Sequence, residues 1–132
     1  MDEHSNRANR VLVVAGEAAT RSFIQRTLES VLLEVETASR FESAIAKIRA
    51  NHFGVLVLDP TIPGVDGIDL LREITRENHS LARRTIVVVE QQTAVADHIP
   101  DFPCCRWIQR PVVRQQLILA VSECLRESSQ RP

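Results

Sequence analysis

Long apolar runs are missing from the 132-residue sequence. A membrane-spanning helix needs ~20 consecutive apolar residues, and no segment approaches that length. The first ten residues are polar and include acids, unlike the apolar centre of a secretory signal. We therefore expect neither a signal peptide nor a membrane helix, and a single globular domain that works in solution.

The chain also has few lysines and cysteines and almost no net charge. Lys47 is the one lysine beside fifteen arginines spread along the chain, and the net charge is −1. Without a basic block, the sequence does not support binding to nucleic acid or to a membrane. Cys104, Cys105 and Cys124 are too few for a disulfide framework, and no Cys or His group has a metal-ligand spacing. We interpret Cys104 and Cys105 as small apolar fillers and expect a reducing, cytoplasmic setting.

Short apolar runs predict the strands of a sheet. Three of them, rich in β-branched residues, are typical of strands buried on both faces and lie at 11–15, 55–58 and 85–89. An alternating stretch at 34–38 predicts an edge strand, and 104–108 suits a fifth strand.

Helical periodicity separates these strands. Apolar residues recur at helical spacing over 23–32, 41–48, 68–74 and 112–125. Ser39-x-x-Glu42 predicts a capping box at the start of the second helix. In the weakest segment, 91–103, we expect one or two helical turns that end at Pro100 and Pro103. Strands alternating with helices indicate an α/β fold, with a parallel sheet covered by helices on both faces.

In such a sheet the working site lies outside the carboxyl ends of the strands, where the strand order reverses. The residues expected there lie at or just after the ends of four predicted strands: Ala15, Gly16, Glu17, Asp59, Glu90, Gln91, Gln109 and Arg110.

The segment from Asp59 to Gly67 reads D-x-x-x-P-G-x-D-G and directly follows a predicted buried strand. It resembles the receiver domains of bacterial two-component response regulators, and Trp107-x-x-Arg110-Pro111 falls at a suitable interval in the same pattern. The resemblance implies a flavodoxin-like, doubly wound sheet of five parallel strands in the order 2-1-3-4-5. It also implies a receiver-like domain over 8–127, with flexible termini at 1–7 and 128–132.

The resemblance further implies a signalling domain rather than an enzyme. Asp59 stands where the family accepts a phosphoryl group from a histidine kinase with the help of Mg²⁺, and Trp107 stands at the family's switch aromatic. Mg²⁺ requires hard oxygen ligands in near-octahedral geometry. We also keep a simpler interpretation, in which Asp59 only ends a strand and caps the following turn.

Three departures from the family pattern affect this site. Ala15-Gly16 replaces two adjacent acids, which leaves Glu17 and Asp59 as weak candidates for binding Mg²⁺. Glu90 replaces a hydroxyl residue that donates to the phosphoryl group, and an ionised carboxylate cannot donate. Arg110 replaces a lysine, and its planar guanidinium suits carboxylates. We hypothesise that Arg110 bridges Asp59 and Glu90 and holds one signalling state; alternatively it forms an ordinary surface ion pair.

These departures predict a degenerate receiver that acts as a protein-interaction module, with phosphorylation at Asp59 impaired or absent. The expected partner is a histidine kinase, another signalling protein, an output domain or a second copy of the chain, with Arg114 and Arg126 as candidate contacts. One alternative is a conventional response regulator that is still phosphorylated on Asp59. A remote alternative is a flavodoxin-like protein that binds a nucleotide or flavin, although the segment after the first strand has no G-x-G-x-x-G loop.

Overall fold

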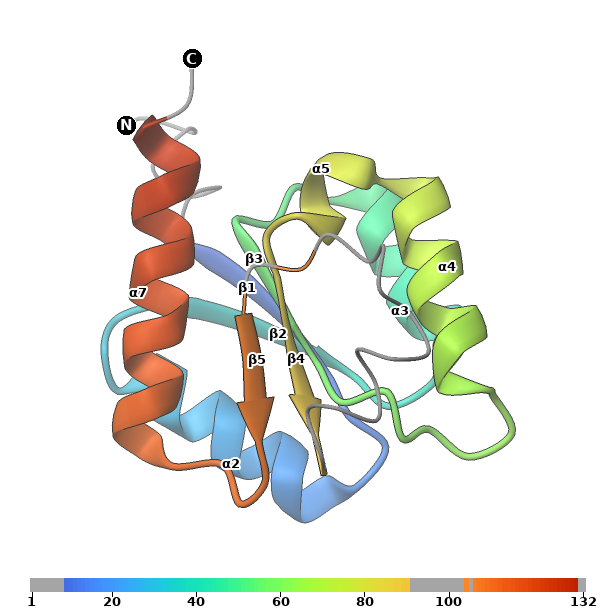
Figure 1. The fold of residues 1–132 in the computed structure, drawn as a ribbon, viewed down its shortest axis with the longest axis horizontal. Coiled ribbons are helices and arrows are strands. Elements are labelled where there is room, and N and C mark those ends of the chain that lie inside the picture. Colours follow the sequence, from blue (N-terminus) through green and yellow to red (C-terminus); the bar gives the residue numbers. More distant parts are fainter. Residues whose placement is uncertain (1–8, 91–103, 105, 131–132) are drawn as a thin grey trace.

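The computed structural model describes residues 9–90, 104 and 106–130 (Figure 1). Its centre is a five-stranded sheet in the order β2-β1-β3-β4-β5, and every neighbouring pair of strands is parallel. The predicted doubly wound topology and its strand order are therefore confirmed. The strands are β1 (Arg10–Val14), β2 (Glu34–Ala38), β3 (Val55–Leu58), β4 (Thr85–Val89) and β5 (Arg106–Gln109).

Helices cover both faces of the sheet (Figure 1). Alternate residues of each central strand point to opposite faces, so Val11 and Val13 of β1 pack into one apolar cluster while Leu12 and Val14 pack into the other. The first cluster is closed by α2 (Ala18–Glu29) and α7 (Arg114–Gln130). The second is closed by α3 (Phe41–Ala50), α4 (Gly67–Glu77) and α5 (His79–Ala82).

Local signals misplaced some helix and strand boundaries. The capping box predicted at Ser39 is wrong: Arg40 is the N-cap of α3 and no side chain caps that end. Helix α5 was not predicted; Asn78 begins it by accepting a hydrogen bond from the Leu81 amide at 3.0 Å. Strand β5 begins two residues later than expected, at Arg106. The helical turns predicted within 91–103 lie outside the described residues.

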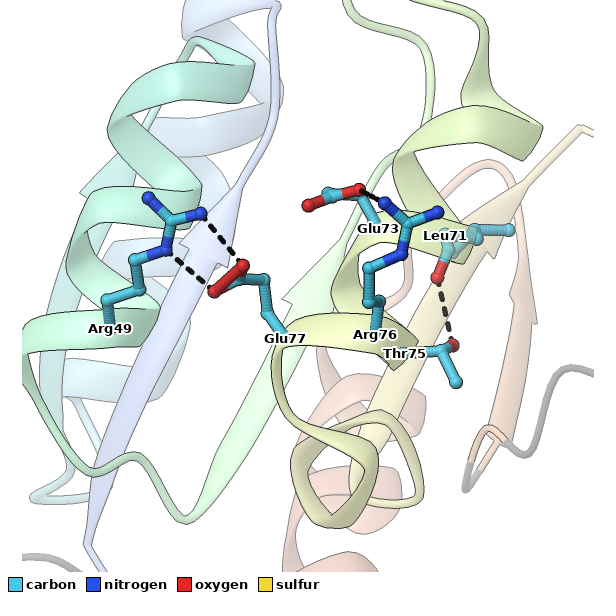
Figure 2. A network of polar contacts seen from close by, with 6 residues as sticks. All are labelled: Arg49, Leu71, Glu73, Thr75, Arg76 and Glu77. Atoms are coloured by element: carbon cyan, nitrogen blue, oxygen red, sulfur yellow. Dashed lines mark hydrogen bonds and ion pairs between the residues drawn. The ribbon is translucent and has the colours of Figure 1, made fainter.

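An ion pair between α3 and α4 joins the two helices on the solvent side (Figure 2). Arg49 donates from Nε and Nη2 to the two carboxylate oxygens of Glu77, at 2.7 and 2.8 Å. This hydrogen bonding raises the pKa of Arg49 and lowers that of Glu77. A second pair, Arg76 with Glu73 at 3.3 Å, stays within α4.

The cysteines differ from each other in state. Cys104 is a free thiol that packs against the cluster under α3 and α4, as expected of a small apolar filler. Burial raises its pKa to about 12. Cys124, fully buried on α7, is disulfide-bonded, a bond that the spacing of the cysteines does not predict. Cys105 lies outside the described residues.

Among the described helices, none combines the length and the apolar composition needed to cross a bilayer.

Candidate functional site

The carboxyl ends of β1, β3, β4 and β5 bring the predicted site residues to one edge of the sheet. Backbone hydrogen bonds extend the parallel ladder past the strand ends and fix these residues in place. The Asp59 amide donates to Val14 O at 2.8 Å, and the Arg110 amide donates to Val89 O at 2.8 Å. The site backbone is therefore a continuation of the core sheet.

Asp59 is buried, with 2% of its surface exposed. One carboxylate oxygen, Oδ1, accepts a hydrogen bond from the Thr61 amide at 3.0 Å. The other, Oδ2, forms an ion pair with Nη2 of Arg110. Asp59 does cap its own turn, as the simpler interpretation expects, but it also has a cationic partner. A buried carboxylate requires such partners because desolvation otherwise makes its charge costly.

Arg110 reaches Asp59 from the end of β5, two strands away across the sheet. Its side chain is only 26% exposed, and the peptide bond to Pro111 is cis. The charge that Arg110 brings to the site is therefore partly shielded from water, which strengthens its attraction to Asp59 compared with an ion pair at the surface.

Glu90 follows β4 at the same edge but its side chain is exposed. No ion pair joins Glu90 to Arg110, both of which the structure describes. The predicted bridge is thus present on the Asp59 side and absent on the Glu90 side. From sequence position alone, Asp59 and Glu90 are both expected near Arg110. In the structure Asp59 is buried and Glu90 is exposed.

The end of β1 presents backbone oxygens instead of carboxylates. Arg21, in the first turn of α2, donates from Nη1 to Ala15 O at 2.9 Å and to Gly16 O at 3.4 Å. Glu17 is exposed, and its carboxylate accepts a hydrogen bond from the Thr20 hydroxyl. Arg21 was not singled out from the sequence, and its position one helical turn after Glu17 was the available signal.

The loop between β3 and α4, residues 59–66, packs closely over the end of β1. Gly64 adopts a φ of +82°, which favours glycine, and Ile62 and Val65 form an isolated antiparallel bridge. Asp66 caps α4 by accepting from the Ile68 amide at 2.8 Å. Much of the D-x-x-x-P-G-x-D-G pattern therefore shapes this loop and the start of the helix.

Trp107 lies on β5 opposite Val87 of β4. Its side chain is half-buried and packs against the apolar cluster under α3 and α4. Trp107 therefore lies on the strand that leads directly to Arg110 and is suited to report on changes at this end of the sheet.

The residues at this edge do not fit a Mg²⁺ site. The metal prefers several carboxylate or water oxygens in octahedral geometry, but Ala15 and Gly16 supply no carboxylate. Both oxygens of Asp59 already have partners, and Arg21 occupies the two carbonyl oxygens at the end of β1. Among the described residues, no group of three or more His, Cys, Asp or Glu side chains is placed to hold a metal ion.

Comparison with known proteins identifies the family. The model of the response regulator receiver domain family matches residues 11–122, and the chain belongs to this family. It is therefore a receiver domain of the kind used in two-component signalling.

Individual curated proteins with similar sequences include two transcriptional regulatory proteins. The chain is 27% identical over 123 residues to the transcriptional regulatory protein ResD of Bacillus subtilis, covering 92% of this chain and 50% of ResD. It is 29% identical over 125 residues to TrcR of Mycobacterium tuberculosis, covering 91% and 46%. The chain thus spans about half the length of these curated relatives.

Solved structures show the same fold. A CheY-like receiver domain protein of Methanospirillum hungatei superposes with a TM-score of 0.83 at 23% identity, covering 92% of this chain and 97% of that one. The signal receiver domain of a LuxO repressor protein of Vibrio parahaemolyticus gives 0.81 at 16% identity, covering 92% of each.

Proposed function

We propose that this receiver domain acts as a protein-interaction module in which Mg²⁺-dependent phosphorylation of Asp59 is impaired or absent. The observation that carries the proposal is the double engagement of the Asp59 carboxylate, by the Thr61 amide and by Arg110. Phosphoryl transfer to a carboxylate needs a free oxygen nucleophile and cations arranged around the transferred group. Here the cation at Asp59 belongs to the protein and neutralises the nucleophile itself.

The surrounding residues support the same conclusion. The two positions at the end of β1 carry no acid to hold a metal, and Glu90 adds a negative charge where the family pattern has a hydroxyl donor. Like charges repel, and because Glu90 is exposed, water screens part of that repulsion. An incoming phosphoryl group would meet that repulsion without a metal ion to offset it.

A permanent Asp59–Arg110 pair would hold the domain in one conformational state. A two-state domain changes state only when a ligand or modification favours one state over the other. With the carboxylate already paired, the domain would signal through which partner it binds rather than through phosphorylation. The proposed partners are a histidine kinase, another signalling protein, an output domain or a second copy.

A groove of roughly 560 Å³ on α2 and the start of α7 supports a protein partner. Phe23 gives it an exposed aromatic side chain, 42% exposed, and Arg26 and Arg114 give it positive charge. Charge complementarity therefore favours a partner segment that is acidic and partly apolar. Arg114, a contact residue expected from the sequence, is one of the residues that line this groove.

Intact mass spectrometry after incubation with Mg²⁺ and acetyl phosphate tests the proposal. Asp59→Asn is the matched control because it removes the acceptor oxygen without changing side-chain size, and Trp107 fluorescence is followed in parallel. We expect no phosphoryl increment on the wild type and no fluorescence change with Mg²⁺ and beryllofluoride. An increment on the wild type that Asp59→Asn lacks would instead establish a conventional response regulator.

A further inference from the structure

Gly16 supports the loop that follows β3. A Cβ atom placed on Gly16 would lie 3.0 Å from Pro63 Cδ and 3.1 Å from the Thr61 carbonyl oxygen. Real Cβ atoms rarely approach heavy atoms so closely, since both contacts lie inside the usual van der Waals separation. A side chain at position 16 would therefore require Pro63 or Thr61 to move by a few tenths of an ångström.

The same loop holds the carboxylate of Asp59. Thr61, whose carbonyl lies over Gly16, donates its amide to Asp59 Oδ1 at 3.0 Å. That bond fixes one carboxylate oxygen and leaves the other for Arg110. The position of Thr61 against β1 consequently sets the orientation in which Asp59 meets Arg110.

The loop is also braced internally, so a displacement at one residue is passed to the next. The Ile62 amide donates to Pro60 O at 3.0 Å, and the Val65 amide donates to Ile62 O at 3.2 Å. Gly67 packs on Pro60, where an added Cβ would lie 3.1 Å from both Pro60 Cβ and Pro60 O. Pressure on Pro63 would thus shift Thr61 rather than be absorbed by a loose segment.

We propose that Gly16 is a positioning residue for Asp59: by leaving space for Thr61 and Pro63, it keeps the Asp59 carboxylate aligned with Arg110. This inference rests on the proposed function, in which that pair is the working state of the domain. Glycine at position 16 then has two effects: it removes the acid of the family pattern, and it leaves space for the loop. Any side chain there, charged or not, would disturb the pair.

Gly16→Ala separates the steric role from the charge. The backbone of Gly16 lies outside the left-handed region, so alanine is compatible with the backbone and tests the contacts alone. Glu17→Ala is the matched control, because Glu17 is the adjacent residue and its side chain is exposed. The readouts are amide hydrogen exchange at Thr61 and the NMR signals of the Arg110 guanidinium, neither of which requires metal or phosphodonor.

We expect Gly16→Ala to lower the exchange protection of the Thr61 amide by about tenfold or more while the protection of β1 and β3 is kept. The Arg110 guanidinium signals should shift in the same variant. Gly16→Asp should act like Gly16→Ala, and Glu17→Ala should leave both readouts within about twofold of wild type. Unchanged Thr61 protection in folded Gly16→Ala would overturn the proposal.

A second variant keeps the proposal testable if Gly16→Ala does not fold. If Gly16→Ala unfolds, Gly16→Ala/Pro63→Ala removes the closest contact atom and should restore the fold with a partly protected Thr61. Failure of this rescue would show that Gly16 serves the fold alone and would refute the positioning role. Phosphorylation of the wild type would overturn the proposed function, yet the exchange comparison would still decide the role of Gly16.

Discussion

Replacing Arg110 with methionine should destabilise the domain strongly, because it leaves the Asp59 carboxylate buried with a single hydrogen-bond donor. Removing one partner of a buried ion pair costs about 3–5 kcal/mol. Arg110 is 26% exposed, so water can partly replace it and we expect the lower end, about 3 kcal/mol. For a domain of this length that loss corresponds to a melting temperature lower by roughly 10 °C.

Urea unfolding followed by circular dichroism measures this loss without relying on Trp107. The double variant Asp59→Asn/Arg110→Met removes both charges and should recover most of the stability, since no unpaired charge remains. Glu90→Gln is the matched control: it removes an acid at the same edge, but from an exposed side chain, and should leave stability unchanged. A loss below about 1 kcal/mol for Arg110→Met, or no recovery in the double variant, would refute the reasoning.

Three further predictions concern other parts of the chain. Leu32 is 89% exposed and has a φ of 69°, so Leu32→Gly should stabilise the domain by about 1 kcal/mol in urea unfolding; a destabilised variant would contradict this. Because burial raises the pKa of Cys104 to about 12, its alkylation by iodoacetamide at pH 8 should be at least ~100-fold slower in the folded protein than in urea, with Cys104→Ser as the control. Hydrogen bonding to Arg49 lowers the pKa of Glu77, so its contribution to stability is present above the ordinary carboxyl pKa and is lost as the pH falls through the folded value; Arg49→Ala should remove that acid-side dependence in stability measured against pH.

Sequence patterns predicted the strands well where the burial of a strand determines its pattern of apolar residues. The stretches at 34–38, 55–58 and 85–89 match β2, β3 and β4 residue for residue. Their apolar or alternating composition follows directly from having two faces or one face covered. By contrast, α5 has only four residues, too short to show a helical period, and the caps of α3 depend on backbone angles that a capping-box pattern does not determine.

The residues of the candidate site could likewise be predicted only in part from the sequence. The end-of-strand rule brought Asp59 and Arg110 together because parallel strands share one carboxyl edge. It could not distinguish buried Asp59 from exposed Glu90, since both follow apolar strands. Nor could it find the role of Gly16, because the approach of Thr61 and Pro63 depends on how a loop folds back over another strand.

The backbone bonds that fix Asp59 and Arg110 at the strand ends bear on how such a site evolves. Because main-chain groups of the sheet hold these positions, their side chains can be exchanged during evolution without rebuilding the fold. The absence of an acid at one strand end and the presence of an arginine at another then need no change in the backbone that carries them. At the carboxyl ends of these strands the chemistry of the side chains can therefore change while the backbone of the sheet stays the same.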